Sequence, residues 1–310
     1  MSHQDHWIAA ELETLDPAGD YNRIISLATG YRVSLLIENL SYTINFLNVT
    51  QAQNGYETLL ATNKVIDKPN LRFREGTELI QFWMTLGLDH PAVQASIEML
   101  NKMHAGVARL VPGNFAEDID YLMAYALIPV FEERLCEKLG EPGLPPFMQQ
   151  AFMHWLEALS KLMTKEHGAQ IGSFPQTYDE LLRMVDKFEN QGFEYDPRRN
   201  ITGEAFLDQF SRDCFPDWPS FGRAFLLTFL PQSVCDTYRW EKPSDELQAL
   251  AIEYLRLHRK ELASGPDPRE ADLFKKLARP DGLTKMVRRA AEAGGLVDGP
   301  KELELASRSA

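Results

Sequence analysis

The chain has few cysteines and no long apolar run. Its three cysteines, Cys136, Cys214 and Cys235, lie far apart and form no C-x-x-C pair, a pattern that suits a reducing cytoplasm better than a disulfide framework. No stretch approaches the roughly 18 consecutive apolar residues of a membrane span. The first residues are polar and acidic and contain no apolar signal core. We therefore expect a cytoplasmic protein without a transmembrane helix.

The chain also lacks an excess of basic residues. It has 32 lysines and arginines against 45 aspartates and glutamates, a formal net charge of −13. A general nucleic-acid-binding protein would carry a basic face, so this class is disfavoured. The same charge argues against electrostatic anchoring to anionic lipid. We expect neither nucleic acid nor a membrane surface as a partner.

Several site signatures are missing from the sequence. The absence of G-x-G-x-x-G and G-x-x-x-x-G-K-[ST] leaves no sign of a dinucleotide or phosphate cradle. H-E-x-x-H and G-x-S-x-G are absent too, which removes the zinc-protease and serine-hydrolase patterns. None of the seven histidines has a glutamate three residues before it, as a di-iron helical bundle would require. There is no C-x-x-C-H, so covalent c-type haem is excluded.

Apolar side chains recur at helical spacing along nearly the whole chain, and no alternating run is long enough for a sheet. The sequence thus predicts an all-α fold. We expect an N-terminal arm over 1–20, one helical domain over 21–263 and a C-terminal appendage over 264–310 of short helices with a frayed end. The predicted helices of the domain span 31–47, 51–62, 76–88, 91–111, 114–139, 146–165, 178–190, 202–212, 219–230 and 244–262.

The helix predicted over 91–111 carries His104 on its apolar stripe, where leucine would be usual. Gly106 follows it, although glycine inside a helix costs about 0.5–1 kcal/mol relative to alanine. One interpretation is that a flat macrocycle lies close to the helix beside an imidazole ligand, in which case haem b fits because one axial histidine holds it. The other is a core histidine bonded to a neighbouring helix, with Gly106 allowing close packing, and this situation is the commoner one.

Five segments resemble the latex-clearing protein (rubber oxygenase) family, which includes the MpaB-like oxygenases. The resemblance runs in consistent order from about residue 21 to 208. The segments are R-F-R-E-G-T-E-L (Arg72–Leu79), M-L-N-K-M-H-A-G-V (Met99–Val107), E-D-I-D-Y-L-M-A-Y-A-L-I-P (Glu117–Pro129), W-L-E-A-L-S-K-L-M (Trp155–Met163) and F-P-Q-T-Y-D-E-L-L (Phe174–Leu182).

This resemblance implies a helical fold around non-covalent haem b, with His104 as the iron ligand. It also implies chemistry with O₂, in the best-known members the oxidative cleavage of an isoprenoid double bond to carbonyl products. Thr77 matches a threonine of the family near the distal face. The chain has Gly76 where rubber-cleaving members have lysine, and Phe73 where they have arginine. These departures indicate a substrate other than the polymer.

Further residues take roles in this interpretation, each with a plainer alternative. Arg72 and Arg74 could bind the haem propionates or flank a helix start in solvent. Arg74 and Thr77 are the candidate catalytic residues, although the Thr77 hydroxyl could instead cap a helix. Gly106 and Ala108 are the small residues that would lie beside the macrocycle. A group of aromatic residues could line an apolar channel but more commonly would fill a core: Phe82, Trp83, Tyr121, Tyr125 and Trp155.

From the resemblance and the position of His104 we expect a haem b-dependent oxygenase, an oxidoreductase that acts with O₂ on an apolar small molecule. One alternative keeps the haem iron but performs hydroxylation, peroxidase-like chemistry or rearrangement of a small natural product. Another is a haem-binding sensor or carrier, or a helical interaction module without a cofactor.

Overall fold

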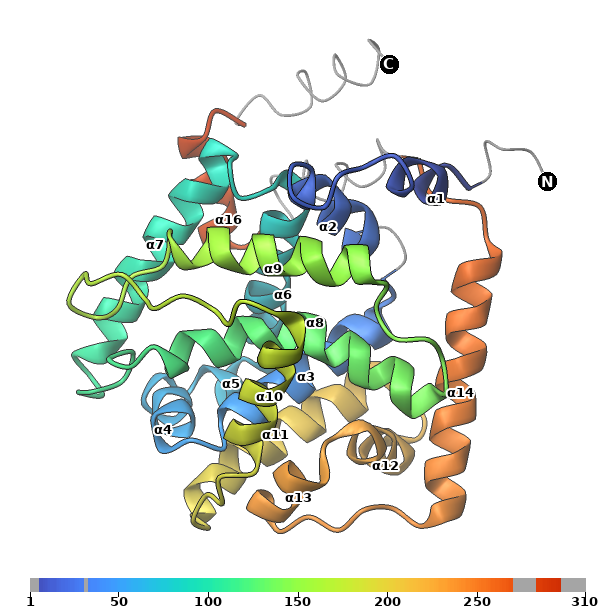
Figure 1. The fold of residues 1–310 in the computed structure, drawn as a ribbon. Coiled ribbons are helices and arrows are strands. Elements are labelled where there is room, and N and C mark those ends of the chain that lie inside the picture. The colour runs from blue at the N-terminus through green and yellow to red at the C-terminus, as the bar shows by residue number, and fades with distance from the viewer. Residues whose placement is uncertain (1–5, 31–32, 270–282, 297–310) are drawn as a thin grey trace.

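A computed structural model describes residues 6–30, 33–269 and 283–296 of the chain. Those residues form an all-α fold without a sheet (Figure 1), and one isolated antiparallel bridge joins Thr164 and Gln170. The predicted class is therefore confirmed. The helices are α1 (Trp7–Leu12), α2 (Tyr21–Gly30), α3 (Leu35–Val49), α4 (Gln53–Thr62), α5 (Lys64–Asp67), α6 (Pro69–Leu86), α7 (Pro91–Ala108), α8 (Ile119–Leu139), α9 (Pro146–Ser160), α10 (Tyr178–Glu189), α11 (Pro197–Cys214), α12 (Pro219–Phe229), α13 (Gln232–Tyr238), α14 (Asp245–Ser264) and α16 (Lys285–Ala293).

The ends of two helices near the centre of the fold differ from the sequence prediction. Helix α6 begins at Pro69, seven residues before the predicted start at Gly76, because proline suits the first helical position and the basic run that follows continues the helix. Helix α8 begins at Ile119 and not near 114. Gly113 and Phe115 have positive φ angles of 86° and 63°, which no helix can include. Helices α2, α5 and α13 were not predicted.

The capping box predicted at the start of α10 is present. The Thr177 hydroxyl accepts from the Glu180 amide, and the Glu180 carboxylate accepts from the Thr177 amide. One residue further on, the Tyr178 hydroxyl donates to the Pro129 carbonyl at 3.1 Å. Pro129 lies inside α8, where its ring interrupts the helical hydrogen bonding. This contact joins α10 to the middle of α8.

The described part of the predicted C-terminal appendage packs against the helical domain. Helix α16 lies along α7 (Figure 1), with Val287 and Ala290 fully buried. A Cβ at Gly294 would lie 2.4 Å or less from backbone and side-chain atoms of Ala92, so the end of α16 approaches the start of α7 too closely for any other residue. The rest of the appendage, 270–282 and 297–310, lies outside the described residues.

The buried apolar side chains form two large clusters. The first is built mainly from α2, α7, α9 and α10, together with the first half of α8 and the second half of α6. The second is built mainly from α3 and α11 to α14, together with the second half of α8. Helix α8 thus contributes to both, and the space between the clusters lies along α3, α6 and α8.

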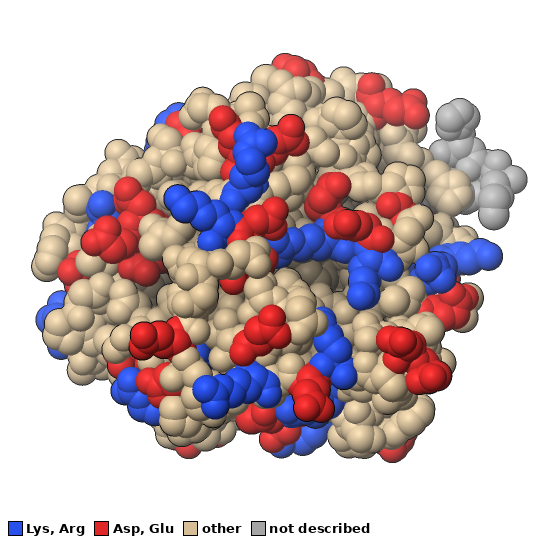
Figure 2. Space-filling model, turned by 60° about the horizontal axis from the view of Figure 1, so that its bottom comes forward, with Lys and Arg blue, Asp and Glu red and all other residues tan. Residues whose placement is uncertain are grey.

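The surface carries charges of both signs. Figure 2 shows lysine and arginine interspersed with aspartate and glutamate over one face of the molecule. Among the described residues, no helix combines the length and apolar character needed to cross a membrane.

We predict that Arg134→Ala destabilises the protein by roughly 3 kcal/mol. Glu189 is 3% exposed, and both of its oxygens accept from Arg134, at 2.6 and 2.7 Å. Removing the arginine leaves a buried carboxylate without its counter-charge, with Asn48 its remaining donor. Denaturant unfolding measures the change. The control is Lys102→Ala, which removes an exposed ion pair with Glu98 at 3.8 Å. For this variant we expect the free energy of unfolding to fall by less than about 1 kcal/mol. Equal effects would contradict the prediction.

Candidate functional site

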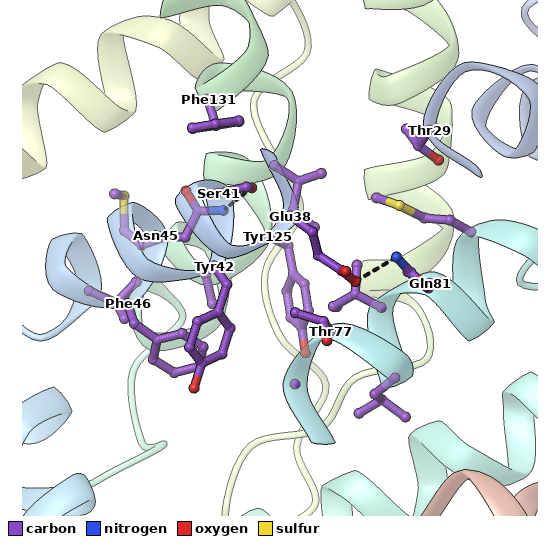
Figure 3. Close-up of a pocket in the computed structure, with 18 of the residues that line it drawn as sticks. Thr29, Glu38, Ser41, Tyr42, Asn45, Phe46, Thr77, Gln81, Tyr125 and Phe131 are labelled. Atoms are coloured by element: carbon purple, nitrogen blue, oxygen red, sulfur yellow. Dashed lines mark hydrogen bonds between the residues drawn. The ribbon is translucent and has the colours of Figure 1, made fainter. Parts of the chain in front are cut away.

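A cavity of about 1680 Å³ lies between the two apolar clusters. Its walls come mainly from α3, α6, α7 and α8, and most of the side chains that line it are apolar. Figure 3 shows one part of it, with residues of α3 and α6 facing each other across the open space. Ligand pockets commonly measure about 300–1,000 Å³, so this cavity has room for a large organic ligand.

His104 lines this cavity from α7. Its ring stacks on Phe115, with centroids 4.1 Å apart and planes at 10°, and meets Tyr121 edge-on at 5.9 Å. These two aromatic contacts fix the plane of the imidazole. Nδ1 is buried and has no hydrogen-bond partner among the described residues. A plain core histidine would form a hydrogen bond to a neighbouring helix. At Nδ1 of His104 this hydrogen bond is missing within the described part of the chain.

The imidazole of His104 is neutral at physiological pH. Burial lowers its pKa from 6.5 to about 4, and the positive charge of Arg72 lowers it further. Histidine must be neutral to coordinate a metal, so its surroundings hold the ring in the form that a ligand to iron needs. Groups of three or more histidine, cysteine or acidic side chains that could hold a metal are absent from the described residues, but a haem needs only one protein ligand.

The two arginines proposed from the sequence differ in position. Arg72 lines the cavity, with its guanidinium carbon 4.6 Å from the centroid of Phe46. Arg74 lies on another face of α6, where it pairs with Glu78 at 3.2 Å, and is not among the lining residues. The structure thus brings Arg72 into the same cavity as His104 and places Arg74 elsewhere.

Thr77 also lines the cavity, from the middle of α6. Its hydroxyl donates to the Phe73 carbonyl one turn earlier, at 3.1 Å. It caps no helix start, because α6 begins eight residues before it. Since the hydroxyl acts as the donor in this bond, its oxygen can still accept a hydrogen bond.

The two small residues that follow His104 do not line the cavity. A Cβ at Gly106 would meet only the Arg109 guanidinium, at an ordinary 3.6 Å, so close packing against another described helix does not require glycine there. Ala108 is buried at 5% exposure within the protein. Of the five aromatic residues considered, Trp83, Tyr121 and Tyr125 line the cavity, whereas Phe82 and Trp155 belong to the core.

Sequence reasoning missed the polar side chains of α3 that line the cavity. Glu38 accepts a hydrogen bond from Gln81 of α6 at 2.5 Å, and the Asn45 amide donates to Ser41 at 3.5 Å (Figure 3). Tyr42 lies between them on the same helix face. The available signal was the spacing of the polar residues at 38, 41 and 45, which places them on one face of the helix.

Comparison of the chain with models of protein families and with curated proteins finds no match. The function must therefore be inferred from the cavity and its residues.

The depressed pKa of His104 predicts a pH dependence of stability. Between the folded value of about 4 and the unfolded value of 6.5, the unfolded chain binds the extra proton, so stability falls as the pH falls. Through this residue we expect the free energy of unfolding, measured by urea denaturation without added ligand, to drop by about 2 kcal/mol between pH 7 and pH 5. In the His104→Leu variant we expect the free energy of unfolding to fall by about 2 kcal/mol less over this pH range, because only the contribution of the other titrating groups remains. Parallel pH curves for both proteins would contradict the prediction.

Proposed function

We propose that the protein is a haem b-dependent oxygenase that acts with O₂ on an apolar small molecule. One observation carries the proposal: a neutral imidazole with an unpartnered Nδ1 stands on the wall of a large, mostly apolar cavity. A buried nitrogen without a partner costs free energy, and a ligand inside the cavity could offset that cost. The resemblance of the His104 segment to the rubber oxygenase family supplies the identity of the cofactor.

Two of the side chains present fit a haem. His104 would hold the iron, and Arg72 would meet a propionate with a charge-assisted hydrogen bond. Arg74, Gly106 and Ala108 do not line the cavity, so they have no part in the proposed site. Bound haem would supply the activation of dioxygen, which amino-acid side chains do not provide.

The remaining lining residues would bind and orient the substrate. Apolar walls exclude water and take up a hydrocarbon. The Thr77 oxygen and the Glu38–Gln81 pair are polar points on these walls, against which a substrate can be oriented. In the finer form of the proposal, O₂ cleaves a carbon–carbon double bond, such as that of an isoprenoid, and each alkene carbon takes one oxygen atom to become a carbonyl.

A second candidate function is an apolar-ligand carrier without haem. Metal-bound histidines almost always donate their second ring N–H to a carbonyl, a carboxylate or water. The described residues provide no such acceptor at Nδ1 of His104. If Nδ1 is the second nitrogen and not the one that binds iron, it lacks the acceptor that a haem site would give it, whereas a carrier needs none and would use the same cavity.

The test of haem binding is the absorption spectrum of the purified protein, expressed with a haem supply. We expect a Soret band that His104→Ala abolishes or strongly shifts, because this substitution removes the axial ligand. His167→Ala is the matched control, since the His167 side chain is 87% exposed and lies outside the cavity. A colourless wild-type protein that takes up no haem on titration would overturn the oxygenase and leave the carrier.

Haem binding alone does not separate an oxygenase from a haem sensor. For that we would measure O₂ consumption by the haem-loaded protein with an unsaturated apolar substrate. Uptake coupled to carbonyl products supports double-bond cleavage, and uptake with hydroxylated products supports the alternative haem enzyme. With no uptake on any unsaturated substrate, the protein would be a sensor or carrier.

A further inference from the structure

Two side chains that can donate hydrogen bonds, Tyr42 of α3 and Arg72 of α6, lie next to Gly76. A Cβ at this position would lie 3.0 Å from a terminal guanidinium nitrogen of Arg72 and 3.0 Å from a ring carbon of Tyr42. Both side chains line the cavity. Both distances are shorter than ordinary Cβ contacts, so glycine at 76 lets the side chains of Tyr42 and Arg72 approach α6 here without crowding.

Tyr42 is 7% exposed, and its hydroxyl has no partner among the described residues. Its ring is held by Phe46 at 4.7 Å, Phe73 at 5.1 Å and Phe206 at 5.8 Å between centroids. In Figure 3 the hydroxyl points away from Ser41 and Asn45. Burial raises the pKa of Tyr42 to about 12, so the hydroxyl keeps its proton. Tyr42 therefore lines the cavity and carries a buried hydroxyl, held on a packed ring, that has no acceptor among the described residues.

Arg72 is half-buried and forms no ion pair with a described carboxylate, although Phe46 supports its guanidinium from one side. The nearby carboxylate of Glu75 is bound to Lys64. The positive charge of Arg72 lowers the pKa of both His104 and Tyr42, whose pKa values are shifted mainly by burial. An arginine in a partly apolar space without a counter-ion leaves a positive potential that favours an anion.

We propose that Tyr42 and Arg72 form a carboxylate subsite, so that the ligand of this cavity is an apolar molecule with an acidic end. Both groups are donors, and a carboxylate offers two acceptor oxygens and the matching charge. An alcohol or an ester would leave the guanidinium without a counter-charge. The proposed subsite depends on the proposed function in one respect only: both assume that this cavity is the ligand-binding site. The carboxylate has two possible sources: an acidic substrate with a long apolar chain, or a propionate of haem b.

The first arm of the test uses the purified full chain without added haem, titrated calorimetrically with oleic acid, oleyl alcohol and methyl oleate. We expect the acid to bind at least tenfold more tightly than the two neutral ligands. Arg72→Gln should remove this preference, and Tyr42→Phe should reduce it several-fold. Tyr42→Phe deletes one unpartnered oxygen atom and leaves the packed ring, so it keeps the test valid if Arg72→Gln fails to fold. The control is Arg109→Gln, an exposed residue outside the cavity.

The second arm compares haem b with its dimethyl ester, by titration of the same proteins. If a propionate is the source, the ester binds at least tenfold more weakly than haem b to the wild type, and the two bind equally to Arg72→Gln. A preference for oleic acid without haem binding supports the subsite and overturns the proposed oxygenase. Haem binding through His104 without a carboxylate preference in either arm supports the oxygenase and overturns the subsite.

Discussion

The burial of helix α8 on two sides is the constraint on which the rest of the structure depends. Its residues as far as Val130 pack in the first apolar cluster, and those from Phe131 onward pack in the second. Pro129 stands at this change, with its carbonyl bound by Tyr178. One 21-residue helix thus joins the two clusters, and its residues form part of the wall of the cavity between them.

Most residues that line this cavity are apolar, but four of the lining residues each have a buried polar side-chain atom without a partner in the described protein. They are Tyr42 Oη, Asn45 Oδ1, His104 Nδ1 and Asn114 Nδ2, and all four residues line it. Each buried, unpartnered group costs roughly 1–3 kcal/mol. The cost is offset when a ligand supplies the matching groups. Sites where a fold departs from full polar satisfaction are where function is expected.

The electrostatics of the site follow from the same burial. The low dielectric around His104 disfavours its charged form, and the nearby Arg72 adds to the effect. Arg72 keeps its own charge because arginine does not deprotonate in proteins. The cavity therefore has two different polar residues on its wall. His104 has a neutral ring nitrogen, which can bind a metal, and Arg72 has a permanent positive charge, which can bind an acid.

The sequence by itself determined the helical class, most helices and the position of His104 on an apolar stripe, because helical periodicity is a local property of consecutive residues. It also placed Arg72 and Arg74 together as candidates, since they are neighbours in the chain. Because α6 begins at Pro69 and not at Gly76, the two arginines lie on one helix and, two residues apart, on different faces. Only the tertiary structure decided which of these faces meets the cavity. It likewise decided that Tyr42, Arg72 and His104 share one cavity. These residues come from three helices, and no local pattern records which faces of distant helices meet.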